Sequence, residues 1–310
     1  MLSIIIPFVA ESPQLFFTVQ ALRHELAGVE HEILLIDNAT ALTNESTHPE
    51  LNCSLYIERK RPSGVRLLKF SERQSHWQAK NLGIEESKGD ILFFIDAHCL
   101  IYPGSLHRMY FDYTYYSLSS RASFHLPLAY LMEDNALAYE LVADLDNGIL
   151  DYRFTPFTPS DPRFASLTPV PCMSTCGMMI RKALMVDKLK SFPEALGPYS
   201  GGEQYFNFIM ALLGYDKIII NLPPLQHYAA PRSYTVSNLD ICRNKLIAAY
   251  LIGGASFLAK RAELFKKELT PSAVDRIHFS IPRIESLKNL RSYIETNSKF
   301  TVEQFVKFWT

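Results

Sequence analysis

Short apolar runs recur along the first third of the chain, and polar or turn-forming residues bound each of them. The clearest runs are residues 2–6, 33–36 and 91–95. An apolar run without polar alternation is typical of a strand that is covered on both faces, as in the interior of a parallel sheet. Residues 14–26 have helical spacing and separate the first two runs, which predicts a right-handed parallel crossover. The pattern therefore predicts an α/β fold.

The pattern is less regular further along the chain. Residues 55–58 and 65–70 predict two weaker strands across a turn, and residues 75–87 predict a helix. Residues 110–130 are rich in aromatic side chains and have room for one or two strands, whereas residues 154–171 contain five prolines and predict an irregular loop. The remaining expected elements are a helix at 206–213, a strand at 217–222, and helices at 245–268, 284–295 and 302–309.

Composition places few limits on function. The 310 residues are 48% hydrophobic, enough for one large core or two modest ones, and the net charge is -1. This balance disfavours a nucleic acid as the default partner, since no basic excess is present. Five cysteines without a Cys-x-x-Cys pair are typical of reduced thiols in a cytosolic protein.

The apolar segments do not predict a membrane protein. Residues 2–6 lack the basic flank of a signal peptide. The longest apolar stretch, residues 246–258, is shorter than the roughly 20 residues that span a bilayer, and Gly253 and Gly254 interrupt it. We therefore expect a buried helix there, no transmembrane segment and a cytoplasmic location.

Candidate chemistry begins where the run at 91–95 ends, because Asp96 and His98 follow it directly. Side chains two residues apart in an extended segment point the same way, so this carboxylate and this imidazole can bind one ion. Open parallel sheets bind ligands beyond the carboxyl ends of their strands, where this pair is expected. An N-capping Asp and a surface His at a turn are the alternative, and these residues alone leave both open.

Several motifs together resemble a glycosyltransferase of the GT-A fold, of the family 2 kind. They are Ile-Ile-Ile-Pro at 4–7, Leu-Ile-Asp-Asn at 35–38, Gln-Ala-Lys-Asn-Leu-Gly at 78–83, the segment 89–98 and Gly-Gly-Glu-Gln at 201–204. More narrowly, the segment 96–99, the Gly-Gly-Glu-Gln turn and His227 resemble the catalytic domain of the polypeptide N-acetylgalactosaminyltransferases. The resemblance implies a Rossmann-like, mixed but mainly parallel sheet flanked by helices over residues 1–235. The helical residues 236–310 are then a C-terminal extension.

The resemblance also implies a nucleotide-sugar donor and a divalent cation, with Mn²⁺ first and Mg²⁺ second. Asp96, His98 and His227 would hold the cation, and this oxygen and imidazole set suits Mn²⁺ without excluding other first-row metals. Without the resemblance, His227 would be interpreted as a loop histidine. For Asp37, the alternative to a donor contact is a strand-end cap. Lys80 stands where the family often has Arg. The compact lysine ammonium group cannot make the two parallel hydrogen bonds that an arginine guanidinium makes. The residues with implied donor contacts are Pro7, Phe8, Glu11, Asp37, Lys80, Asn81, Asp96 and Ala97.

The implied reaction moves a sugar from a UDP-linked donor, such as UDP-GalNAc or a related hexose, to an acceptor hydroxyl. Glu203, Gln204 and Arg232 are the implied catalytic residues, with Arg232 in a closing segment at 228–234. Gln204 stands where inverting relatives carry an Asp base, and since an amide cannot accept that proton we expect a retaining reaction that gives an α-linkage.

Two alternatives remain open. The first is an inverting enzyme of the same fold, whose base would be one of the carboxylates Glu203, Asp134, Asp144 and Asp146. The second is a non-catalytic nucleotide-sugar binding or nucleotidyltransferase-like protein, which the lack of glycine in residues 8–12 disfavours. Five classes of acceptor remain open: a glycan, a lipid-linked sugar, a metabolite, a protein or a modified nucleic acid. The sequence does not predict the oligomeric state.

Overall fold

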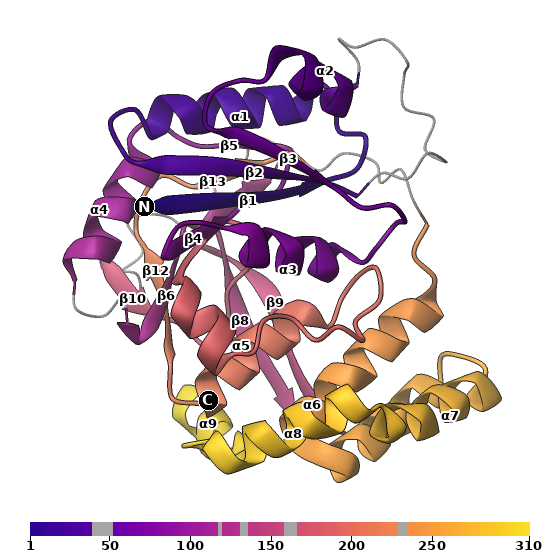
Figure 1. Ribbon diagram of the computed structural model, residues 1–310. Coiled ribbons are helices and arrows are strands. Elements are labelled where there is room, and N and C mark those ends of the chain that lie inside the picture. The colour runs from indigo at the N-terminus through magenta and orange to yellow at the C-terminus, as the bar shows by residue number, and fades with distance from the viewer. Residues whose placement is uncertain (39–51, 117–119, 131–135, 158–165, 229–234) are drawn as a thin grey trace.

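The computed structural model describes residues 1–38, 52–116, 120–130, 136–157, 166–228 and 235–310. An eight-stranded sheet forms the centre of the molecule, in the order β10-β12-β6-β11-β4-β1-β2-β3 (Figure 1). Its strands are β1 (Leu2–Phe8), β2 (His31–Asp37), β3 (Val65–Lys69), β4 (Ile91–Phe94), β6 (Ala122–His125), β10 (Leu167–Pro169), β11 (Met178–Arg181) and β12 (Asp216–Ile220).

The half of this sheet built from β3, β2, β1 and β4 is parallel, as the apolar runs predict. All seven residues of β1 are buried. Ile4 and Ile6 pack into one apolar cluster and Ile5 into another, because successive side chains point to opposite faces. Strand β11 runs antiparallel to β4 and β6, so the sheet is mixed. The α/β fold with a mainly parallel sheet is confirmed.

A second sheet has five strands in the order β5-β13-β7-β8-β9. They are β5 (Cys99–Leu100), β13 (Leu225–His227), β7 (Leu128–Tyr130), β8 (Ala136–Asp144) and β9 (Ile149–Phe157). The predicted loop at 154–171 is wrong for residues 154–157, which lie in β9, and for residues 167–169, which form β10. The prediction failed because prolines are tolerated on an edge strand such as β9 and because a cross-strand stack of Tyr139 on Tyr152, with ring centroids 4.4 Å apart, supports the hairpin.

Helices α1 (Gln14–Glu25) and α3 (His76–Glu86) follow the prediction. The strand predicted at 55–58 is wrong, since these residues lie in α2 (Cys53–Lys60). The Asn52 side chain accepts a hydrogen bond from the Leu55 amide, and this N-cap outweighs the strand preference of the segment. Residues 110–130 hold two strands, β6 and β7, after the helix α4 (Ser105–Tyr115).

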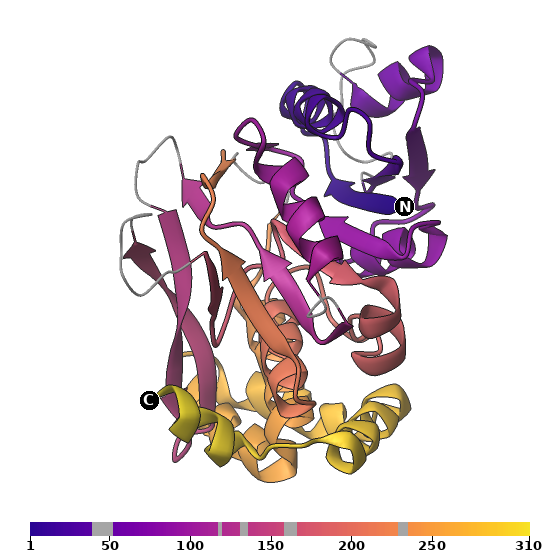
Figure 2. The same ribbon diagram turned by 90° about the vertical axis from the view of Figure 1, so that its left-hand side faces the viewer.

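The C-terminal region is helical. It consists of α6 (Asn238–Lys266), α7 (Pro271–Ser280), a short 3-10 turn at Ile281–Arg283, α8 (Glu285–Asn297) and α9 (Val302–Trp309). Helix α6 packs on α5 (Gly202–Leu212) and shares an apolar cluster with one face of the main sheet. Figure 2 shows the β8–β9 hairpin extending towards these helices. The division at residue 235 stays a prediction.

No helix within the described ranges is both long enough and apolar enough to cross a membrane. The apolar stretch at 246–258 is the buried part of α6, and its backbone leaves helical geometry at Gly254, where φ is 71°.

Candidate active site

The three predicted metal ligands meet at the carboxyl edge of the main sheet. Asp96 and His98 follow β4, whereas His227 ends β13. Antiparallel pairing of β13 with β5 sets His227 opposite Cys99, and the Tyr228 amide donates to the His98 carbonyl at 2.9 Å. This pairing brings together side chains that are 131 positions apart in sequence. The predicted proximity is therefore observed, and metal binding itself stays a prediction.

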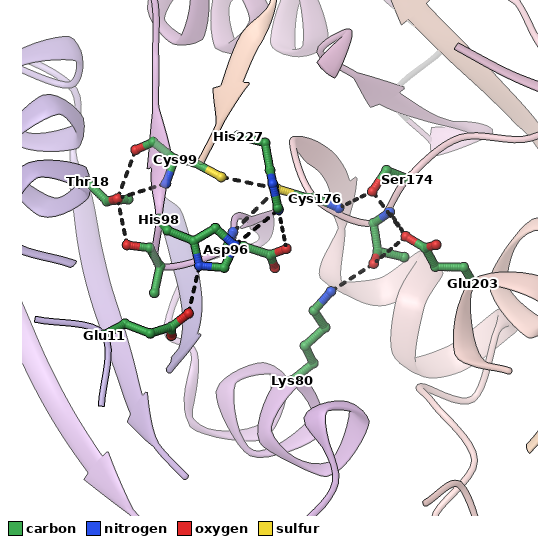
Figure 3. Close-up of polar contacts among 12 residues, drawn as sticks. Glu11, Thr18, Lys80, Asp96, His98, Cys99, Ser174, Cys176, Glu203 and His227 are labelled. Carbon is green, nitrogen blue, oxygen red and sulfur yellow. Dashed lines mark hydrogen bonds and ion pairs between the residues drawn. The ribbon is translucent and has the colours of Figure 1, made fainter. Parts of the chain in front are cut away.

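The ligand atoms of Asp96, His98 and His227 converge within 4.8 Å of one another (Figure 3). The Nε2 atoms of the two histidines are 3.2 Å apart, and His227 Nε2 is 3.3 Å from Asp96 Oδ2. Two ligands at right angles around a cation at ~2.1 Å are about 3.0 Å apart, so these spacings fit one octahedral ion. Asp96 Oδ1 is buried and has no hydrogen-bond partner among the described residues. These atoms can hold a divalent cation.

Asp96 is ionised in this setting. Burial by itself raises the pKa of the Asp96 carboxyl, but the hydrogen bond with His227 and the charges of Lys80 and His76 outweigh burial and hold that pKa well below its usual range. Lys80 is 1% exposed, and its Nζ donates to Thr175 Oγ1 at 2.8 Å. Lys80 therefore lies under the site as a buried counter-charge, and its predicted donor contact stays a prediction.

Glu11 orients one of the candidate ligands, a role that sequence reasoning missed. Its Oε1 is 2.6 Å from His98 Nδ1, and its Oε2 accepts a hydrogen bond from the Val9 amide at 3.2 Å. A carboxylate on one ring nitrogen of a histidine fixes the ring orientation and leaves the other nitrogen for a metal. Glu11, itself a predicted donor contact, thus connects the loop after β1 to the candidate metal ligand His98.

Glu203 lies in the first turn of α5 and organises the loop before β11. Its Oε1 accepts from Ser174 Oγ at 3.0 Å and from the Thr175 amide at 2.9 Å, and its Oε2 accepts from Tyr152 Oη at 2.5 Å. Thr175 also binds Lys80, so the same loop connects Glu203 to the charge beneath Asp96. No local motif marks these partners of Glu203, since Tyr152 and the adjacent pair Ser174 and Thr175 come from two separate segments.

Gln204 points away from Glu203, towards helix α6. Its Nε2 donates to Asp151 Oδ1 at 3.0 Å, and Asp151 Oδ2 pairs with Lys245 Nζ at 2.7 Å and with Arg261 at 3.6 Å. The predicted catalytic residues Glu203 and Gln204 are therefore neighbours in sequence that belong to different polar networks.

Three of the other predicted donor residues, Pro7, Phe8 and Asp37, lie at strand ends, and Asn81 lies in α3. Pro7 and Phe8 close β1, and Asp37 closes β2, where it accepts a hydrogen bond from Ser54 Oγ. Asn81 is engaged by the backbone of Phe192, donating to its carbonyl at 2.8 Å and accepting from its amide at 3.0 Å. Ala97 is buried, at 1% exposure. Arg232, Asp134 and most of the segment 228–234 lie outside the described residues.

Residues 3–114 match the family model described as Glycosyl transferase family 2. These residues therefore resemble a family 2 glycosyltransferase. The chain is also similar to human polypeptide N-acetylgalactosaminyltransferase 15, at 29% identity over 122 residues, which are 39% of this chain and 18% of the relative.

Solved structures agree on the GT-A fold of the chain. GalNAc-T7, solved with UDP, GalNAc and Mn²⁺, superposes with a TM-score of 0.70 at 17% identity, over 99% of this chain and 56% of that one. The 1–349 fragment of S. aureus TarS, solved with UDP-GlcNAc, gives a TM-score of 0.53 at 13% identity, over 95% of this chain and 90% of the fragment. The chain thus spans little more than half of the GalNAc-T7 chain.

Proposed function

We propose that this chain is a family 2 glycosyltransferase that transfers a hexose from a UDP-sugar to an acceptor hydroxyl with the help of a divalent cation. The observation that carries the proposal is the convergence of Asp96, His98 and His227 at the carboxyl edge of the sheet. GalNAc-T7 and TarS, which share the fold, were solved with UDP or a UDP-sugar. UDP-GalNAc and UDP-GlcNAc are therefore the first donors to test.

Asp96, His98 and His227 would hold the cation, with Mn²⁺ first because GalNAc-T7 was solved with it and Mg²⁺ second. When bound, the cation supplies Lewis-acid stabilisation of the diphosphate leaving group. The protein contributes the geometry: Glu11 fixes the His98 ring, and Lys80 adds positive charge beneath Asp96. Asp37, Pro7 and Phe8 are the proposed contacts of the base and ribose, and Asn81 and Ala97 complete the proposed donor pocket.

We favour retention of configuration, in which the leaving diphosphate oxygen takes the acceptor proton on the same face of the sugar. The neutral Gln204 supports this, because it cannot serve as a base. Glu203 accepts from four hydroxyl and amide donors, which suits a positioning role. The carboxylates Asp144 and Asp146 lie at the turn of the β8–β9 hairpin, whose Gly148 packs against α6. Arg232 remains a proposed closing residue.

The inverting alternative is tested by NMR of the product. An α-linkage formed from an α-linked donor supports retention, and a β-linkage refutes it. A non-catalytic role is disfavoured by the similarity of residues 3–114 to the family 2 glycosyltransferases.

The proposed donor and cation are tested together by a screen of UDP-, GDP- and dTDP-sugars, measuring hydrolysis with Mn²⁺ and without added metal. We expect Mn²⁺-dependent hydrolysis of one UDP-sugar even without an acceptor. Equal turnover of all three nucleotide classes, or turnover that EDTA leaves unchanged, contradicts the proposal.

A cytoplasmic location is also part of the proposal. It is supported by the five cysteines, all buried and none in a disulfide within the described residues. Cell fractionation tests it, and recovery of the enzyme in a secreted fraction contradicts it. The acceptor class stays open and is approached by adding candidate glycans, lipid-linked sugars and proteins to the same donor assay.

A further inference from the structure

Two cysteine side chains lie beside the candidate metal ligands. Cys99 begins β5 and Cys176 lies in the loop before β11, and their Sγ atoms are 3.6 Å apart. Both residues are buried, at 0% and 3% exposure. Among the residues that the structure describes, the ligand atoms of Cys99, Cys176 and His227 lie within 4.8 Å of one another. His227 therefore belongs to two groups of converging ligand atoms, and Figure 3 shows both sulfurs next to its ring.

We propose that Cys99, Cys176 and His227 form a second, thiophilic site that binds Zn²⁺ or Cd²⁺ and competes for His227 with the site at Asp96 and His98. The competition for His227 rests on the proposed function, because it requires a cation at Asp96 and His98. The thiophilic site itself does not depend on that function. Two sulfurs and one imidazole are a ligand set that soft and borderline cations prefer, and a carboxylate with two imidazoles suits harder ones. The two overlapping groups thus differ in the cation they select.

His227 has the features that a shared ligand requires. Its Nε2 faces Asp96 and His98, and its Nδ1 is buried with no hydrogen-bond partner among the described residues. A neutral imidazole has a free lone pair on only one of its two nitrogens. The ring can therefore serve one cation at a time, and a cation held by the sulfurs withdraws His227 from the other group.

Binding of a cation by Cys99 and Cys176 releases the protons of both thiols. A cysteine thiol has an ordinary pKa of about 8.5, so the thiol is the form present at neutral pH before a cation arrives. A coordinated thiol loses its proton, so the S–H bonds break as the metal–sulfur bonds form and the protons pass to solvent. No oxidant or reductant is needed.

The test is a titration of the full chain with Cd²⁺, read by the ultraviolet charge-transfer band of Cd²⁺–thiolate bonds. We expect the band to saturate at one Cd²⁺ per chain and to disappear in Cys99→Ala and in Cys176→Ala. Cys172→Ala is the matched control, because Cys172 is equally buried but outside the group, and it should keep the band. A band that survives both substitutions, or that Cys172→Ala removes, refutes the site.

Folding of each variant is checked by circular dichroism, and Cys99→Ser and Cys176→Ser replace an alanine variant that fails to fold. Competition is measured separately, from the free Mn²⁺ signal in electron paramagnetic resonance as Cd²⁺ is added. Release of bound Mn²⁺ supports the shared His227, and simultaneous binding of both cations contradicts it. If the cysteine-dependent band appears but no Mn²⁺ binds, the thiophilic site is supported and the proposed catalytic metal site is refuted. If Mn²⁺ binds but the band does not appear, the catalytic metal site is supported and the thiophilic site is refuted.

Discussion

Two charged clusters flank the start of helix α5, and they differ in how their charges are balanced. In the first, Asp151 accepts from Gln204 and pairs with Lys245 at 2.7 Å and with Arg261 at 3.6 Å. Because two cationic side chains of the same chain balance the Asp151 charge, this carboxylate needs no cation from solution. This cluster joins β9 to α6, and its chemistry is that of a structural ion pair.

The second cluster, formed by Asp96, His98 and His227, brings a carboxylate and two imidazole rings together with no Lys or Arg among its members. Two imidazole nitrogens lie 3.2 Å apart, and Asp96 Oδ1 is buried without a partner among the described residues. Gln204 Oε1 in the first cluster is also without a partner in the described part of the chain, but it is a neutral amide oxygen beside cations. Burial and polarity are thus common to both clusters. The second cluster is distinguished by the convergence of three potential metal-ligand atoms, one of them on a carboxylate.

The largest expected effect tests this distinction directly. Asp96→Ala should lower Mn²⁺-dependent donor hydrolysis by more than about 100-fold, because loss of partners outside the ligand shell alone costs about 10–100-fold. Steady-state kinetics on the best donor of the screen measures it. Glu72→Ala, which removes an exposed carboxylate of the described region, is the control and should stay near the parent value. Activity retained in Asp96→Ala would remove Asp96 from the site.

A smaller effect is expected from Glu11→Gln. The amide still reaches His98 Nδ1 but cannot stabilise the ring as a carboxylate does, so Mn²⁺ affinity should fall by about 10–100-fold. Isothermal titration calorimetry measures the affinity without an activity assay. Glu72→Gln changes an exposed carboxylate of the described region and should leave the affinity unchanged. Equal affinities in Glu11→Gln and the parent would show that Glu11 does not support His98.

The Gln204→Ala substitution should cost about tenfold or less in kcat/KM, the size of one lost neutral hydrogen bond. The physical reason is that Gln204 touches Asp151 and not the ligand group, so it orients α5 and transfers no proton. Steady-state kinetics with the same donor provides the comparison. A loss as large as that of Asp96→Ala would place Gln204 in the chemistry and blur the difference between the two clusters.

The smallest effect on the site is expected from Lys245→Met, which weakens only the first cluster, around Asp151. Unfolding in urea should show a loss of about 1–3 kcal/mol in the free energy of unfolding, because Asp151 loses its nearest charged partner. Mn²⁺ affinity of the folded variant should equal that of the parent. A changed affinity with unchanged stability would reverse the roles assigned to the two clusters.

The parts of the fold that the sequence predicts are those with a local physical cause. The apolar runs of β1, β2 and β4 predict buried parallel strands because both faces of the sheet are covered. Helix α2 was missed although a signal existed, since Asn52 is a strong N-cap residue placed just before the segment.

The site was predictable only in part, because much of it depends on distant pairing. The spacing of Asp96 and His98 is local, but His227 joins them through the β5–β13 pairing, and only the family resemblance pointed to it. The contact of Glu11 with His98 spans 87 positions, and Tyr152 reaches Glu203 from a hairpin that the sequence pattern did not predict. Contacts of this kind leave no periodic trace in the sequence.

The central claim is that Asp96, His98 and His227 bind one divalent cation. The most direct measurement is an electron paramagnetic resonance titration of Mn²⁺ against the parent, His227→Ala and, as a control, His107→Ala, which changes an exposed histidine. The account predicts one bound Mn²⁺ per chain in the parent and in His107→Ala, and a loss of binding in His227→Ala. Undiminished Mn²⁺ binding in His227→Ala would contradict it.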